Sequence, residues 1–201
     1  MYKRLSNHIL YIVGLSAILL PPLAVNAEAQ TKLIKRNGWY QGAPIEVFDL
    51  KVKGRSVSFN EAFEADVNWL KDVSLKIKNN SEKAIVCIYM GVIFRETAPA
   101  PMMYPRYFGR PTNTGIEPKG QPLELRPGEA LTVSFASEFE EMKSVVEHRR
   151  PVDSVNIVEL GITRVYFEDG MMWDLGELYR PDPDNLGKWI LVEEGAWIPP
   201  V

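Results

Sequence analysis

Few side chains in this sequence have the types and spacing that catalysis requires. Beyond residue 27 the chain holds one histidine, His148, and one cysteine, Cys87, far apart in sequence. Blue-copper sites, histidine-rich zinc sites and most nucleophile–base pairs need more of these residues. No G-x-S-x-G, P-loop or G-x-G-x-x-G motif occurs. We therefore expect a non-catalytic protein, and we expect Cys87, in the apolar run I-V-C-I-Y, to be a buried strand residue.

The carboxylates offer one remaining enzymatic alternative, a hydrolase that uses two acids. The paired acids of the sequence, Glu140-Glu141 and Glu193-Glu194, are adjacent. Adjacent side chains diverge on a helix or a strand, so each pair is expected to form a solvated face. A carboxylate-based hydrolase is accordingly the weaker reading.

The strongest metal candidate is a calcium site near the C-terminus, at Asp182, Asp184 and Glu193. Counted from Asp182, acids stand at positions 1, 3 and 12 and Gly187 stands at position 6, as in an EF-hand loop. Position 5 is a leucine, and prolines at 181 and 183 oppose an entering helix. The alternative is a simple Pro-Asp turn without any cofactor.

The best ligand-binding candidate lies in a long connection between residues 97 and 122, which contains six prolines. Long loops are usually functional or disordered. Two alternatives remain open here: a binding loop, or a segment that covers a sheet edge and buries its aromatic residues. The residues concerned, within Met102–Arg110, are Tyr104, Arg106, Tyr107, Phe108 and Arg110.

The first residues have the pattern of a Sec signal peptide. Lys3 and Arg4 precede an apolar run of 12 residues, Ile9 to Leu20, which is too short to span a membrane. Small residues then place cleavage after Ala27 or Ala29. The sequence thus predicts a signal peptide at 1–27, a flexible segment at 28–43, one domain at 44–201, and a secreted or periplasmic location without a membrane span.

The net charge of −3 and the absence of a basic cluster exclude several partner classes. Nucleic acids and anionic membranes attract basic surfaces, so neither is an expected partner. An unidentified protein or another cell-surface component remains as the expected partner.

The elements that must position these residues are short strands. Residues 73–78 alternate between apolar and polar, residues 84–94 are almost wholly apolar, and residues 131–135 alternate again. We expect a bulge near Val47 and Phe48, a helical turn within 60–69, and one helix at 137–147. For that helix, Ser137 is the predicted N-cap and Glu140 completes a capping box. Seven or eight strands with one short helix predict an all-β, antiparallel sandwich.

A β-hairpin between residues 154 and 176 organises this prediction. A two-residue Asp-Gly turn would mix polar and apolar residues on each face. A three-residue loop, 168–170, pairs Val165 with Trp173 and Arg164 with Asp174, so that apolar residues share one face. A second bulge is expected at residues 161–163, where the apolar phase changes.

Three segments carry a resemblance to a known class of proteins. They are L-K-I-K-N-N-S-E-K-A-I at 75–85, L-R-P-G-E-A at 125–130 and V-Y-F-E-D-G-M-M-W at 165–173. In these segments the chain resembles uncharacterised secreted bacterial single-domain proteins with an immunoglobulin-like or fibronectin-III-like β-sandwich. The resemblance implies that fold and brings no catalytic residues. The expected function is a non-catalytic binding or interaction module; the alternative is a carbohydrate- or small-ligand-binding module that uses the Met102–Arg110 segment.

Overall fold

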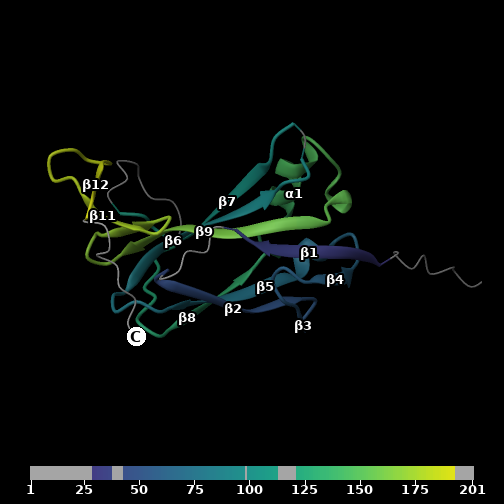
Figure 1. Cartoon of the computed structure of the whole chain (residues 1–201), viewed down its shortest axis with the longest axis horizontal. Coiled ribbons are helices and arrows are strands. Elements are labelled where there is room, and N and C mark those ends of the chain that lie inside the picture. Colours follow the sequence, from purple (N-terminus) through teal and green to yellow (C-terminus); the bar gives the residue numbers. More distant parts are fainter. Residues whose placement is uncertain (1–28, 38–42, 98, 113–120, 193–201) are drawn as a thin grey trace, which may run out of the picture.

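The computed structural model describes residues 29–37, 43–97, 99–112 and 121–192, which form an all-β protein (Figure 1). The predicted class is confirmed: the described residues build two sheets and one short α-helix, α1 (Phe139–Glu147). The large sheet contains β1 (Gln30–Arg36), β4 (Ala62–Ala65), β6 (Ile85–Phe94), β7 (Met102–Gly109), β9 (Ile157–Phe167), β10 (Met172–Asp174), β11 (Glu177–Pro181) and β12 (Trp189–Leu191). The small sheet contains β2 (Ile45–Val52), β3 (Arg55–Ser56), β5 (Val73–Asn79) and β8 (Ala130–Ser134).

The two sheets face each other across one continuous apolar core. In Figure 1, β2, β5 and β8 of the small sheet lie below β1, β7 and β9 of the large sheet. Both sheets and α1 contribute buried side chains to the same cluster. The largest apolar ones are Trp69, Trp173, Phe94, Phe135 and Phe167, none more than 1% exposed. Burial of such large aromatic surfaces is the main favourable contribution to folding. No helix among the described residues is long and apolar enough to cross a bilayer.

Strand β9 is the centre of the large sheet. Strand β6 pairs with one side of it, while β1 and β10 share the other side. β1 runs parallel to β9 and pairs with residues 157–160, whereas β10 runs antiparallel and pairs with residues 164–166. The sheet is therefore mixed, which corrects the expectation of purely antiparallel pairing.

The hairpin of β9 and β10 has the predicted three-residue loop. Val165 pairs with Trp173 and Arg164 with Asp174. The Phe167 amide donates to the Met171 carbonyl at 2.9 Å, and Gly170 takes a positive φ of 82°. This register buries Val165 and Trp173 on the core side. Burial of these two side chains is the physical reason that the hairpin adopts this register.

Both predicted bulges are present. Along β9, Tyr89 pairs with Arg164 and the next residue, Met90, pairs with Ile162, so Thr163 is the extra residue. In β2 the pairing shifts between Phe48 and Lys51. Asp49, within that shift, has a positive φ of 52° and forms an ion pair with Lys51 at 2.8 Å. Bulges of this kind bend a strand and re-aim its side chains.

Strand β1 replaces the flexible segment that the sequence predicts before residue 44. Residues 30–36 pair with β4 on one side and with β9 on the other. The alternation was hidden because a lysine, Lys32, occupies a buried position two residues before Ile34. Tertiary hydrogen bonds, which a sequence pattern does not reveal, make that position tolerable for a lysine.

Two smaller expectations are also corrected. The helical turn predicted within 60–69 is a 3-10 helix, η1 (Trp69–Asp72), which begins only at the last of these residues, because residues 62–65 form strand β4. A second 3-10 helix, η2 (Val152–Ser154), precedes β9. Helix α1 begins at Phe139, with Glu138 at the N-cap and no side-chain cap hydrogen bond. The predicted capping box at Ser137 is therefore absent, because the helix starts one residue too late for it. The predicted apolar face is present, with Phe139, Met142 and Val146 buried.

Candidate functional site

The segment predicted as a long binding loop contains an edge strand. Residues 102–109 form β7, which pairs along its length with β6 and lies at the edge of the large sheet. Prolines favoured the loop prediction, but an edge strand tolerates Pro105 because one side of it has no hydrogen-bonding neighbour. The segment thus pairs with and covers the edge of β6, which is the second of the two alternatives stated for it. Residues 98 and 113–120 of the connection lie outside the described part of the chain.

Strand alternation divides the predicted binding residues between the two faces of the sheet. Tyr104, Arg106 and Phe108 point into the space between the sheets, and Tyr104 and Arg106 are buried. Tyr107 points to the opposite, outer face and is 56% exposed. Arg110 follows the strand and is exposed. The five residues do not form one site.

Arg106 joins three elements of the fold. Its Nη2 donates to the Glu138 carboxylate at 2.6 Å and to the Ser134 carbonyl at 3.1 Å. The guanidinium carbon lies 4.9 Å from the centre of the Phe108 ring and 5.0 Å from that of Phe135. Burial lowers the pKa of Arg106, and the Glu138 carboxylate opposes that shift. The side chain therefore ties β7 to β8 and to the start of α1.

Tyr104, two residues before Arg106 on the same face of β7, also connects this strand to α1. Its hydroxyl donates to Glu141 of α1 at 2.8 Å. Burial, followed by that hydrogen bond, raises the pKa of Tyr104 to about 12. Tyr104 and Arg106 thus hold α1 against the edge of the sandwich.

The outer face of the large sheet carries a row of side chains, one from each of four neighbouring strands. We call Tyr107, Tyr89, Arg164 and Asp174 the tyrosine row. Tyr107 pairs with Tyr89, Tyr89 with Arg164, and Arg164 with Asp174. The two tyrosine rings lie 4.7 Å apart between centroids, and Arg164 Nε donates to Asp174 Oδ2 at 2.9 Å. Burial raises the pKa of Tyr89, and the neighbouring Tyr107 adds to that shift.

More aromatic side chains extend this face beyond the tyrosine row. Tyr166 and Met172 form a small buried cluster with Cys87, and Tyr179 and Trp189 pack against it. The Tyr166 and Trp189 rings meet edge to face with centroids 5.8 Å apart. Aromatic residues on this face therefore come from β6, β7, β9, β11 and β12, and Tyr166 of β9 is buried among them.

Sequence reasoning identified only Tyr107 among the members of this face as a candidate. Tyr89 lies in a strand that is almost wholly apolar, so nothing marked it as outward-facing. The hairpin register did place Arg164 and Asp174 together on the wet face, and that signal, followed across to β6, could have found Tyr89. The pairing of β6 with both β7 and β9 is needed to complete the row.

The predicted calcium residues are arranged as a turn where the structure describes them. Asp182 Oδ1 accepts from the Asp184 amide at 2.9 Å, and its Oδ2 accepts from Asn185 Nδ2 at 2.9 Å. These hydrogen bonds lower the pKa of Asp182, the Asp184 amide first. Glu193 lies outside the described residues, within which no cluster of three or more His, Cys, Asp or Glu side chains could hold a metal. The side chain of Asp182 is thus used to stabilise the turn.

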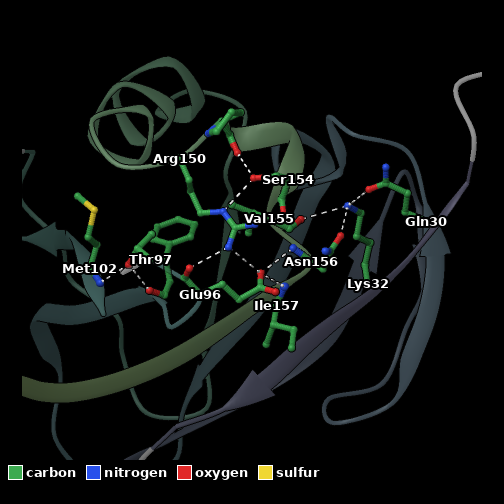
Figure 2. A network of polar contacts seen from close by, with 12 residues as sticks. Gln30, Lys32, Glu96, Thr97, Met102, Arg150, Ser154, Val155, Asn156 and Ile157 are labelled. Atoms are coloured by element: carbon green, nitrogen blue, oxygen red, sulfur yellow. Dashed lines mark hydrogen bonds and ion pairs between the residues drawn. The ribbon is translucent and has the colours of Figure 1, made fainter. Parts of the chain in front are cut away.

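A buried polar network lies at the opposite end of β9 (Figure 2). Lys32 is fully buried, and its Nζ donates to Gln30 Oε1 at 2.8 Å, Asn156 Oδ1 at 2.9 Å and the Val155 carbonyl at 3.1 Å. Burial lowers the pKa of Lys32, and the negative charge of Glu96 partly opposes this. All three protons of the ammonium group are satisfied, so Lys32 is not poised as a nucleophile.

Arg150, three residues after α1, and Glu96, two residues after β6, extend this network. Arg150 donates to Ser154 Oγ at 2.9 Å and to the Glu96 carbonyl at 2.8 Å. Glu96 accepts from the amides of Asn156 and Ile157 at 2.9 and 3.1 Å. Figure 2 shows these groups pointing toward one another from different parts of the chain. The network fixes the start of β9 and is structural.

We expect stability to fall at alkaline pH, in part through Cys87. Burial raises the pKa of this thiol from 9.0 to about 12. Above pH 9 the unfolded state loses the proton while the native state keeps it, so the unfolded state is favoured as pH rises from 9 to 12. One such group contributes a slope of up to about 1.4 kcal/mol per pH unit. Urea unfolding of the parent chain and of Cys87→Ala, at pH 7 to 11, measures this slope.

The comparison of slopes isolates the thiol. The contributions of Lys32 and Tyr104 are common to both proteins and cancel in the difference. Cys87→Ala should be less stable at pH 7 because it leaves a small cavity, but its stability should decline less steeply above pH 9. Equal slopes would show that the thiol titrates normally in the folded protein.

We compared the chain with protein families, curated proteins and solved structures. No family model matches the chain, and neither a curated protein nor a solved structure gives a significant match.

Proposed function

We propose that this chain is a non-catalytic, secreted or periplasmic binding module that uses the outer face of its large sheet. The proposed fold is an immunoglobulin-like sandwich. The two facing sheets around one core support it. The N-terminal pattern at residues 1–27 supports export. A protein or another component of the cell surface is the proposed partner.

The observation that carries the proposal is the tyrosine row. An exposed tyrosine, Tyr107, lies against a second ring, Tyr89, and beside a charge pair on the same face. Tyrosines are favoured in binding surfaces because a rigid aromatic body and a polar hydroxyl contact a partner at low cost in conformational entropy. Met103 lies on the same side of β7 and is 46% exposed, so apolar contact area continues along the strand.

A carbohydrate is the second candidate ligand, and the geometry of the same row favours it. The face of a sugar ring carries C–H groups that stack on aromatic rings, while its hydroxyls need donors and acceptors nearby. Tyr107 and Tyr89 supply the aromatic surface. Arg164 and Asp174 supply donor and acceptor groups, one and two strands from Tyr89. This version of the proposal moves the carbohydrate site from the whole Met102–Arg110 segment to the outward-facing Tyr107.

The non-enzymatic assignment is supported by how three carboxylates near β7 and the tyrosine row are used. Asp174 is paired with Arg164, and Glu138 with Arg106. Glu141 accepts a hydrogen bond from Tyr104. Hydrolysis by two carboxyl groups needs an acid and a base that face each other across the scissile bond, whereas these groups are each engaged with a different side chain. Measurable turnover on a panel of glycosides and esters would contradict the assignment.

The test is a binding comparison between the parent chain, Tyr107→Ala and a matched control, Leu186→Ala. Leu186 is 78% exposed in the turn between β11 and β12, on none of the four strands that carry the tyrosine row, so its truncation should not change binding at that row. Tyr107→Ala should weaken binding to the ligand about tenfold or more, as expected for loss of a central aromatic contact. A glycan array and a pull-down with envelope proteins give the two arms of the experiment.

The two arms separate the ligand classes. Glycan binding that Tyr107→Ala reduces supports the carbohydrate version. Capture of an envelope protein that Tyr107→Ala reduces, with no glycan bound, supports the protein version. Binding in either arm that survives both Tyr107→Ala and Tyr89→Ala would remove the tyrosine row from the proposal.

A further inference from the structure

The edge strand β7 turns half of its backbone hydrogen-bonding groups away from β6. Just beyond the strand, the Arg110 amide donates to the Val86 carbonyl at 3.1 Å. In an antiparallel pair, residues that bond across the strands alternate with residues that do not. The pairing of β7 with β6 has no register shift. Residues 102, 104, 106 and 108 therefore bond to β6, and residues 103, 105 and 107 turn their backbone groups to the open edge.

This open edge is long and only lightly protected. β7 has eight residues, whereas the other edge strands of the described sheets, β3, β4, β8 and β12, have two to five. Edge strands are usually protected from pairing by shortness, lysine, proline or a bulge. β7 has no lysine and no bulge, and its one proline, Pro105, removes a single outward N–H. Within residues 29–37, 43–97, 99–112 and 121–192, no hydrogen bond uses the outward backbone groups of Met103 or Tyr107.

Carboxylates lie on the inner face of this edge. Glu138 accepts a hydrogen bond from Arg106 at 2.6 Å, and Glu141 accepts one from Tyr104 at 2.8 Å. The guanidinium neutralises the first carboxylate, but the tyrosine hydroxyl is uncharged, so these four side chains together carry one net negative charge. Glu141 is exposed, and the Glu138 side chain is 37% exposed. The inner face therefore favours a positively charged neighbour.

We infer that β7 binds an extended segment of a partner protein as an additional strand, in which apolar residues alternate with basic residues. The outward backbone groups of the edge supply main-chain hydrogen bonds, and the alternate side chains supply selectivity. Directly opposed residues of paired strands share a face. Partner residues opposite Met103 and Tyr107 thus lie on the outer face, where these two side chains are 46% and 56% exposed and favour apolar contact.

Partner residues opposite Tyr104 and Arg106 lie on the inner face, where a lysine or arginine meets the carboxylates. This inference names the partner in the protein version of the proposed function and rests on it, because Tyr107 belongs to both surfaces.

The test measures the fluorescence anisotropy of the labelled peptide fluorescein-Lys-Tyr-Lys-Val-Lys-Val-Lys-amide in a titration with the full chain. Saturable binding is expected with a Kd below about 1 mM, the weak range appropriate to a short peptide that orders on binding. N-methylation of the tyrosine and the last valine removes N–H groups that face β7 and should weaken binding about tenfold or more. N-methylation of the two central lysines alters N–H groups that face away, so it should change the Kd by less than about threefold.

Changes in the chain itself give a second readout. Met103→Pro removes an outward N–H without removing a bond to β6, and it should weaken peptide binding about tenfold or more. Met103→Ala is the matched control, which keeps the N–H and should cost about threefold or less. Glu141→Gln should weaken binding about twofold or more, since it removes the unneutralised charge of the inner face.

Two outcomes would overturn the inference: no saturable peptide binding, or equal Kd values for the two N-methylated peptides. If Tyr107→Ala still reduced binding to an envelope protein or a glycan in either case, the proposed function would stand without the added strand. If the peptide bound as expected while Tyr107→Ala and Tyr89→Ala left both of those ligands bound, the proposed function would fail and the edge of β7 alone would remain as a binding surface.

Discussion

Replacement of Trp69 by alanine is expected to destabilise the protein by about 3–5 kcal/mol, as for other fully buried aromatic residues. Trp69 has no exposed surface. Its indole Nε1 donates to the Val155 carbonyl at 3.1 Å, and its ring packs against Phe63. The same carbonyl accepts from Lys32 Nζ, so the indole lies directly beside the buried polar network. Truncation therefore opens a cavity and removes one partner of a buried carbonyl.

Urea unfolding at neutral pH measures this loss, and Trp69→Phe separates its two parts. Phenylalanine keeps most of the apolar volume but lacks the N–H donor. Because Val155 still accepts from Lys32, we expect a loss of only about 1–2 kcal/mol. In a domain of this size each kcal/mol lowers the melting temperature by about 2–4 °C. Equal losses for the two variants would mean that the hydrogen bond, and not the packing, dominates.

Replacement of Gly109 by alanine is expected to cost about 3 kcal/mol or more, through strain and steric overlap together. Gly109 ends β7 with a φ of +92°, which alanine adopts poorly. A Cβ at this position would overlap the Val86 carbonyl oxygen and would lie 2.6 Å from the Leu123 Cβ. That carbonyl also accepts from the Arg110 amide at 3.1 Å, so it is not free to move.

Gly128→Ala is the matched control for this prediction. Gly128 has a similar φ of +79°, but nothing lies within 4 Å of a Cβ there. Its replacement should cost about 1 kcal/mol, from backbone strain alone. The difference between the two variants, measured by chemical unfolding, is the energy of the overlap at the end of β7. If Gly109→Ala were no worse than Gly128→Ala, the close approach of β7 to Val86 would be wrong.

The local pattern of the sequence predicted the elements with strong alternation or strong turn chemistry. Strand β5 and the hairpin of β9 and β10 follow directly from period-2 burial. The loop at 168–170 was predictable because only one register places Val165 and Trp173 on the same buried face. The bulge at Thr163 was predictable for a similar reason, since the apolar phase changes there.

The two strands that the sequence pattern did not predict, β1 and β7, share one physical cause: their environment depends on residues that are distant in the sequence. Strand β1 was missed because Lys32 interrupts its apolar pattern, and only Gln30, Val155 and Asn156 make that burial acceptable. Strand β7 was missed because Pro105 is excluded from central strands but not from an edge. Whether a strand lies at an edge is a property of the whole sheet and not of its own residues.

The sequence by itself determined the all-β class, the register of the central hairpin and the scarcity of catalytic side chains. These follow from side-chain periodicity and from composition, which are local properties. The tertiary structure alone decided which aromatic residues meet. Tyr107 and Tyr89 belong to different strands, and Arg164 and Asp174 belong to two more, so the tyrosine row exists only because β9 and β6 bring four strands into register. Sheet order, which the local sequence does not encode, therefore selects the face on which binding is proposed.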